Sequence, residues 1–329
     1  MTVDLDEGRP PTRTSRDNRH RVVIKYASAV PLQLLEAYLN KKCDWDPKIL
    51  SCVTFIDHLL RESPSRRYTT IKRSFFDDSV RMQLTGGVEA WKGIFQSARL
   101  SNDGGNAGKG RMILNVDVAT AVFWSEGNVL DLASTILRVE VRSIVDAWKR
   151  DQAGKKQYPR ELRRIKKVRF FCKHRKSDTG KEAKINTIEG FTELNAKQIQ
   201  FEWSRWENDV KKTHTTTVEK YYQMNYGIVL KFPELPLIKT RKKEECYPME
   251  ICFVEKAQRY PFKLNDVQTA DMIKFTVTKP HVRLHNIQEN VTALGWAKDP
   301  LLKAYDMKIE DKMICVSTGK LPFLHVPMS

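Results

Sequence analysis

The sequence lacks long hydrophobic runs, and no stretch reaches the roughly eighteen consecutive apolar residues that a transmembrane helix needs. Residues 1–11 also lack the apolar core of a secretory signal peptide. Cysteine is scarce, with 6 residues in 329, and none stands in CxxC spacing. This excludes a recognisable zinc motif and argues against a disulfide framework. We therefore expect a protein without a membrane anchor that works inside the cell, in the cytoplasm or the nucleus.

Glycine is also uncommon, and the one glycine-rich loop lies at residues 103–110. Its glycine spacing departs from that of a phosphate-binding loop, and Gly110 stands where a Ser or Thr would hold magnesium. We interpret it as a surface loop. The sequence shows no signature of carboxylates clustered for metal catalysis, so we expect no cofactor, no metal site and no catalytic residue.

Positive charge is abundant, with 57 Lys and Arg against 40 Asp and Glu, a formal net charge of +17. Much of it lies in residues 149–176, where thirteen Lys or Arg face two acidic residues. The simplest explanation of such a run is a charged surface in contact with solvent. The alternative is a binding surface for a polyanion, either a membrane surface or a nucleic acid. Because the run holds few large apolar residues to insert into lipid, a nucleic acid is favoured.

Tyrosines and basic residues lie together after this run, at residues 208–236 and 247–268. Tyrosine hydroxyls and lysines bind phosphate oxygens, and aromatic faces stack on unpaired bases. The combination is typical of a single-stranded nucleic-acid pocket. A β-rich core with surface lysines explains the same composition.

Hydrophobic periodicity predicts a mixed protein of helices and strands. After a polar tail at 1–19, we expect a strand at 21–26, helices at 31–39 and 49–60, short strands over 71–128, one or two helices at 129–144 and a strand-rich region at 168–253. A capping box at residues 216–219 would begin a short helix that Gly227 ends, before a strand at 228–232. Residues 265–268 begin another helix, 287–294 read as helical, and 313–316 as a strand.

Several motifs resemble the eukaryotic Argonaute family, in its order. Those at residues 66–76, 86–99 and 114–123 are similar to the end of the family's N-terminal domain and its first linker. Residues 217–236, 247–259 and 316–322 are similar to its PAZ domain and second linker. The resemblance implies a disordered tail at 1–19, a partial N-terminal domain at 20–70, linker 1 at 71–128, a PAZ domain at 129–280 and linker 2 at 281–329.

The fold that the resemblance implies is an α+β multidomain protein. Its PAZ domain would be an OB-like β-barrel with an inserted αβ module, flanked by the linkers and a partial α/β N-terminal domain. Nothing in this sequence matches the family's MID domain or its PIWI domain, which performs cleavage in endoribonuclease relatives. We therefore expect no catalysis by this chain.

The resemblance also implies a pocket for the 3′ end of RNA. Its expected residues are Tyr221, Tyr226, Phe201, Lys263, Leu264, Lys184 and His174. Tyr221 would contact the terminal phosphate and Phe201 would stack on the last nucleotide, with Trp203 as the alternative. Tyr222 is expected in the core, and Cys172 competes with His174 in the alignment. Arg163, Arg164, Lys166 and Lys167 would contact the RNA backbone.

This sequence departs from the family pattern at three positions of the expected pocket. Tyr226 replaces a histidine and cannot carry positive charge. Lys184 replaces an arginine, and so loses the bidentate contact, and Ala183 replaces a tyrosine. The sequence also has extra residues between Phe201 and Tyr221.

The expected function is RNA binding in RNA-mediated gene silencing, or RNA interference. The partners would be a small single-stranded guide RNA held by its 3′ end, its duplex with target and proteins of the silencing complex, with no membrane. The alternative is a degenerate PAZ scaffold that acts in protein interaction or binds RNA without preference for an end.

Overall fold

The computed structural model describes residues 2–4, 19–101, 110–152, 160–174, 184–207, 210–241, 245–310 and 313. These form two compact units, one from residues 1–61 and 97–115 and the other from 62–96 and 116–329. The glycine-rich loop after position 101, Ala183 and almost all of the strand expected at 313–316 lie outside the described residues. No helix in the described part is long and apolar enough to cross a membrane.

The first unit is built on two helices. It comprises the strand pair β1 (Thr2–Asp4) and β2 (Arg19–Arg21), α1 (Leu32–Leu39) and most of α2 (Pro47–Ser65). Leu35, Ile49 and Cys52 form its buried core. Ile49 and Cys52 begin the apolar stripe from which the second helix was predicted, and α2 continues beyond the predicted residue 60 to Ser65.

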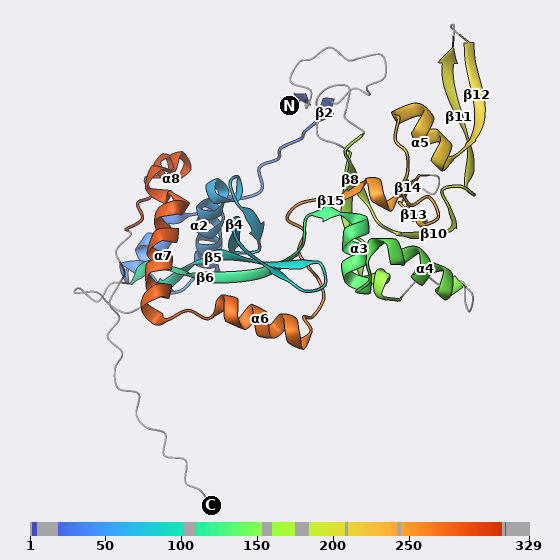
Figure 1. Cartoon of the computed structure of the whole chain (residues 1–329). Helices are drawn as coiled ribbons and strands as arrows, with labels where there is room; N and C mark the ends of the chain where they lie inside the picture. The colour runs from blue at the N-terminus through green and yellow to red at the C-terminus, as the bar shows by residue number, and fades with distance from the viewer. Residues whose placement is uncertain are drawn as a thin grey trace, which may run out of the picture. The chain divides into compact units, whose positions relative to one another are not determined.

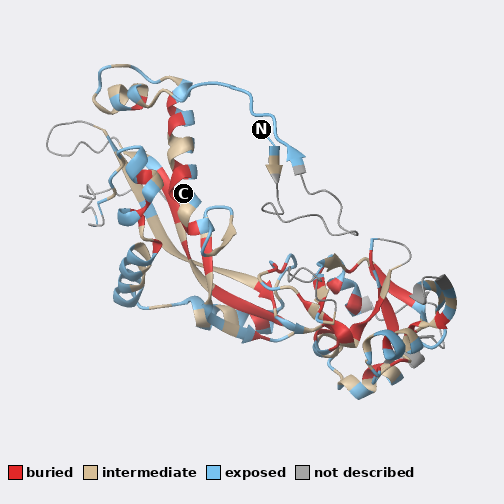
Figure 2. Ribbon diagram, turned by 90° about the horizontal axis from the view of Figure 1, so that it is seen from above, coloured by how far each residue is buried: buried red, intermediate tan, exposed pale blue. Residues whose placement is uncertain are grey.

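Two N-terminal predictions differ from this unit. The expected tail contains β1 and the start of β2, and the expected strand at 21–26 ends at once, because the pairing of β2 with β1 ends at Arg21, opposite Thr2. Strands are stabilised by cross-strand partners. Residues 22–30 are instead irregular and exposed, as their pale blue trace shows (Figure 2).

The second unit begins with a four-stranded sheet. Its order is β3 (Thr69–Ile71), β4 (Ser74–Leu84), β5 (Val88–Ser101) and β6 (Arg111–Trp124), with the last two continuing into residues of the first unit. Strands β4, β5 and β6 are longer than the short ones expected there. On one face the rings of Trp91 and Phe123 stack at 4.3 Å, and Phe76 packs edge-on against Phe123.

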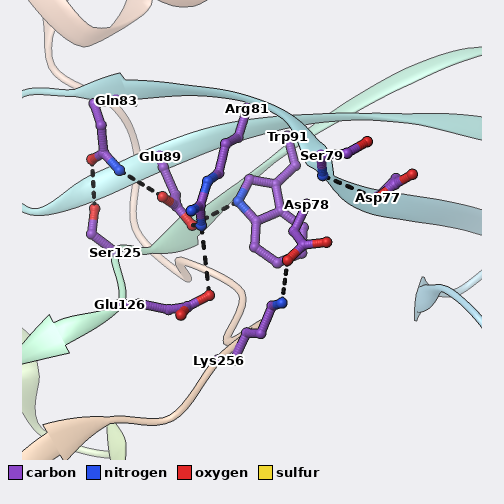
Figure 3. A network of polar contacts seen from close by, with 10 residues as sticks. All are labelled: Asp77, Asp78, Ser79, Arg81, Gln83, Glu89, Trp91, Ser125, Glu126 and Lys256. Carbon is purple, nitrogen blue, oxygen red and sulfur yellow. Dashed lines mark hydrogen bonds and ion pairs between the residues drawn. The ribbon is translucent and has the colours of Figure 1, made fainter.

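A polar network joins this sheet to later segments (Figure 3). The Glu89 carboxylate, 1% exposed, accepts hydrogen bonds from Trp91 Nε1 and Gln83 Nε2, both at 2.7 Å. Arg81 lies 3.6 Å from both Glu89 and Glu126. Charge-assisted hydrogen bonds satisfy this buried carboxylate, which fixes the residues around the β4–β5 turn.

Three more sheets and a set of short helices complete the second unit (Figure 1). The sheets have the orders β7-β15-β8-β9, β10-β13-β14 and β11-β12. Their strands are β7 (Gly127–Asn128), β8 (Arg169–Cys172), β9 (Asn186–Thr187), β10 (Gly190–Asn195), β11 (Gln200–Glu207), β12 (Val210–Thr217), β13 (Pro236–Lys239), β14 (Cys246–Pro248) and β15 (Cys252–Val254). The helices are α3 (Val129–Leu137), α4 (Val141–Gln152), η1 (Arg160–Ile165), α5 (Val218–Tyr226), η2 (Met249–Ile251), α6 (Asp266–Thr276), α7 (Pro280–Leu294), η3 (Trp296–Lys298) and α8 (Pro300–Ala304).

The chain is therefore a mixed helix and sheet protein, as expected. Within the described residues each sheet is open, and the strand pairing closes none into a barrel. The one or two helices expected at 129–144 are α3 and α4, and α6 begins at the predicted start, where Asn265 and Gln268 form a capping box. Helix α7 starts seven residues before the predicted 287.

The strand predicted at 228–232 is absent, although the segment is apolar enough. Its backbone is held by a side chain instead of a neighbouring strand. The Glu250 carboxylate accepts hydrogen bonds from the backbone N–H groups of Lys231 at 2.8 Å and Phe232 at 3.1 Å. The next strand along the chain is β13, which begins at Pro236.

Candidate nucleic-acid interface

Helix α5 carries three tyrosines and is held by residues at both ends. Thr217 is the N-cap, and its Oγ1 accepts a hydrogen bond from Lys220 N at 3.3 Å. Gly227 ends the helix at a positive φ of 65°, a conformation that glycine adopts without strain. The predicted helix and its end are confirmed. The predicted capping box is wrong by one residue, because Thr216 stays in β12, paired with Phe201.

The β11–β12 hairpin lies beside this helix (Figure 1). Its register pairs Phe201 with Thr216 and Trp203 with His214. Side chains two residues apart share one face of a strand, so both aromatic residues of β11 face the same side. Their rings lie 5.2 Å and 5.5 Å from the ring of Tyr221. The structure thus places both Phe201 and its alternative, Trp203, against the same tyrosine.

The segment that follows β8 adds a third element to this group of aromatic residues. The ring of His174, two residues beyond the strand, lies 5.2 Å from Tyr222 and 4.6 Å from Tyr226. Tyr221 and Tyr226 are 5.8 Å apart. We call the residues joined by these ring contacts the aromatic cluster: His174, Phe201, Trp203, His214, Tyr221, Tyr222 and Tyr226.

Burial divides the cluster into a floor and an accessible rim. Tyr222 is 2% exposed and belongs to the hydrophobic core, as predicted. Phe201, Trp203, Tyr221 and Tyr226 are only partly buried. The Nε1 atom of Trp203 is buried and has no hydrogen-bond acceptor among the described residues. The rim therefore offers the aromatic surfaces of these partly buried rings to a ligand.

The other expected pocket residues are not joined to the cluster by a ring contact. Leu264 packs on the same hydrophobic core, and Lys263 beside it is exposed. Lys184 is engaged elsewhere, since its Nζ lies 3.3 Å from a carboxylate oxygen of Glu245. That oxygen also accepts a hydrogen bond from the Tyr247 hydroxyl. The charge of Lys184 is therefore already partly neutralised.

The basic residues expected at the RNA backbone lie in and after the short helix η1. Arg163, Arg164, Lys166 and Lys167 are all exposed. Lys167 pairs with Glu189 at 2.5 Å. Exposed ion pairs contribute little and exchange readily, so this pair leaves the lysine accessible to phosphate. Most of the other charges of the 149–176 run lie on side chains that are not described.

His214 was not predicted as a member of the site. Its ring lies 5.8 Å from that of Trp203, its cross-strand partner. The signal was present in the alternation of Phe201 and Trp203, which marks one face of a strand. Placing His214 on that face also requires the hairpin register, which the alternation alone does not fix.

Comparison with known proteins shows which family this chain resembles. Residues 143–273 match the PAZ domain model and residues 70–125 match the Argonaute linker 1 domain model. The chain is Argonaute-like. It is 34% identical over 292 residues to the protein argonaute of Schizosaccharomyces pombe, which covers 88% of this chain and 33% of that protein. It is 27% identical to protein argonaute 1A of Oryza sativa subsp. japonica, over 93% of this chain and 26% of that protein.

A solved structure shares the fold of this Argonaute-like chain. The crystal structure of Kluyveromyces polysporus Argonaute with a guide RNA matches 85% of this chain and 30% of that chain, with a TM-score of 0.50 and 14% sequence identity. At this identity the match concerns the fold alone. The Argonaute-like chain thus spans about a third or less of the length of these relatives.

Proposed function

We propose that this chain is an RNA-binding part of an Argonaute-like protein and that its aromatic cluster holds the 3′ end of a small guide RNA. The observation that carries the proposal is the convergence of α5, β11 and the end of β8 on one partly exposed group of rings. Base stacking on such rings contributes about 1–3 kcal/mol per base and tolerates any sequence. Tyrosine hydroxyls supply donors for ribose and phosphate oxygens.

The remaining parts of the proposal follow from the family. The chain would comprise a tail, a partial N-terminal domain, linker 1, an OB-like PAZ domain and linker 2, with the boundaries given above. The guide, its duplex with target and silencing-complex proteins would be its partners in the cytoplasm. The fold match to an Argonaute solved with a guide RNA supports this assignment. The proposal assigns binding to these residues and no catalysis.

The exposed basic residues near η1 would attract the RNA and contact its backbone. Each phosphate contact to a single strand lowers the slope of log affinity against log salt by about 0.7. This component depends on charge and not on the end of the strand. End recognition and backbone attraction can therefore be separated by salt.

The test is a double variant, Tyr221→Ala with Tyr226→Ala, in fluorescence anisotropy with a linear single-stranded RNA. We expect at least about a tenfold loss of affinity, because two ring contacts and two hydroxyls are removed. Met224→Ala is the matched control, since Met224 is on the same helix and 66% exposed. Unchanged affinity in the double variant would overturn the assignment of the pocket.

A second candidate function is a degenerate scaffold that binds RNA without reading its end. The pairing of Lys184 with Glu245 favours it, because an expected phosphate ligand is already occupied. This candidate predicts salt-sensitive binding that the double variant leaves unchanged.

A further inference from the structure

A groove lies on the opposite side of the β4–β6 sheet from the Trp91–Phe123 stack, and the proposed function does not use it. It has a volume of about 300 Å³ and is covered by α7. We call it the β4–β6 groove. Phe75, Ile94 and Val118 from the three strands line it, as do Asn286, Glu289 and Asn290 from α7. All of these residues belong to the second unit.

The walls of the groove are tied to one another at both ends of α7. Near its start, Arg283 forms a bidentate pair with Asp117 of β6, and its Nε lies 3.0 Å from Asp117 Oδ1. Near its end, Arg67 Nη1 donates to the carbonyl of Ala293 at 3.3 Å, and Nη2 donates to that of Leu294 at 2.5 Å. The groove between these points is therefore formed before any ligand binds.

The face of α7 that lines the groove is unusual for a helix packed on a sheet. Its lining residues are Asn286, Glu289, Asn290 and Ala293, at the i, i+3, i+4 and i+7 spacing of a single face. A helix that closes a hydrophobic core presents apolar residues at this spacing. Within the described residues, the side-chain amides of Asn286 and Asn290 form no hydrogen bond in the protein. The groove thus combines an apolar floor with polar groups that still have hydrogen-bonding capacity.

The charges in the groove exclude one class of ligand and favour another. Asp77 and Glu289 line it, and Glu289 also lies 3.2 Å from His285. The one lysine of the lining, Lys92, lies 4.8 Å above the ring of Phe275. Two carboxylates repel phosphate, so the phosphates of a ligand would stay outside the groove, and the groove itself suits a neutral group with amino hydrogens. Asn side chains pair with the amino and ring-nitrogen edge of adenine, and carboxylates accept from exocyclic amines.

We infer that the β4–β6 groove binds one unpaired adenine base of a bound RNA, independently of the 3′ end. Its volume is at the small end of ligand pockets, about 300–1,000 Å³, and this size suits a single base. The apolar floor would cover the ring, and Tyr68 in the lining supplies an aromatic surface. Uracil would present carbonyl oxygens to the carboxylates of Asp77 and Glu289, so it binds less well.

The experiment uses circular RNAs, which have no ends. Both circular RNAs have about 20 nucleotides, which exceeds the roughly 4–16 nucleotides that a typical single-strand site covers. One contains only uridine, and in the other several well-separated uridines are replaced by adenosine. Because one good base contact discriminates by about 1–3 kcal/mol, we expect the adenosine ring to bind at least about fivefold more tightly by anisotropy. Isolated adenosines avoid the stacking of an all-adenosine strand.

The paired variants are Asn286→Ala with Asn290→Ala, and Gln288→Ala as the control. Gln288 is exposed on the same helix and does not line the groove. Since alanine favours helix, neither variant threatens α7. The double variant should abolish the preference for adenosine and keep its affinity for the uridine ring, whereas the control should keep the preference.

Three results would overturn the inference. The first is equal affinity of the wild-type chain for the two circular RNAs, and the second is a preference for adenosine that survives in the double variant. The third is an arginine-rich peptide that binds the wild-type chain but not the double variant and displaces neither circular RNA, which would show that the groove takes a protein side chain instead. Because rings have no 3′ end, failure here leaves the proposed function intact, and failure of the Tyr221 and Tyr226 test leaves this inference intact.

Discussion

At the residue scale, Glu89 shows how a buried charge is stabilised in this fold. Its carboxylate accepts two hydrogen bonds at 2.7 Å and lies 3.6 Å from Arg81 (Figure 3). Removing one partner of such a group leaves the others buried and unsatisfied. We expect Glu89→Ala to lower the free energy of unfolding by about 3 kcal/mol in urea denaturation.

The matched control for Glu89 is Glu126→Ala. Glu126 pairs with the same arginine at the same distance, but its side chain is 41% exposed. An exposed ion pair contributes between about 0 and 1 kcal/mol. Equal losses in the two variants would show that burial and the hydrogen bonds to Trp91 and Gln83 do not matter.

The Asp78–Lys256 pair predicts a small pH dependence of stability. The hydrogen bond from Lys256 lowers the pKa of Asp78 below its ordinary value of 3.8. A lowered folded pKa means that the stabilisation is fully present above that value and is lost as the pH falls through the lower folded pKa. Because the Asp78 side chain is 37% exposed, the effect should stay below about 1 kcal/mol.

The measurement compares wild type with Lys256→Met in thermal unfolding at neutral pH and near pH 3. The wild type should be slightly more stable at neutral pH, and the difference should shrink in acid. A difference that grows as the pH falls would contradict the assigned pairing.

At the scale of elements, the position of the aromatic cluster depends on where α5 ends. Gly227 has a φ of 65°, and a Cβ added there would meet nothing within 4 Å. The cost of Gly227→Ala is therefore backbone strain alone, about 1 kcal/mol. We expect this loss in urea denaturation together with weaker binding of linear RNA.

Gly190→Ala is the control for this prediction. A Cβ at Gly190 also meets nothing within 4 Å, but its φ is not in the left-handed region. It should change stability by less than about 0.5 kcal/mol. If both variants behave alike, the left-handed end of α5 does not determine the position of the tyrosines.

Local signals in the sequence were enough to predict several elements. The stripe through Ile49 and Cys52 predicted α2, the cap at Asn265 predicted α6, and Gly227 predicted the end of α5. Each of these signals lies within the element that it defines. The strand expected at 228–232 failed because Glu250, distant in sequence, binds that backbone instead.

At the scale of the whole molecule, composition and motif order predicted a mixed, basic, Argonaute-like chain, and the comparisons confirm the family resemblance. The way in which the site residues come together was harder to predict from the sequence. His174, Trp203 and Tyr226 come together through three elements, and His214 joins them only through the hairpin register. The groove under α7 also depends on long-range contacts, such as that of Arg283 with Asp117.

The most direct test of the account is the affinity of this chain for a linear single-stranded RNA with a free 3′ end, compared with the same RNA circularised. Anisotropy at two salt concentrations separates end recognition from backbone attraction. We predict clearly tighter binding of the linear RNA at both concentrations, with the difference lost in the Tyr221→Ala, Tyr226→Ala variant. Equal binding of the two RNAs that disappears as salt rises would contradict it, and would leave only the basic residues near η1 to bind RNA.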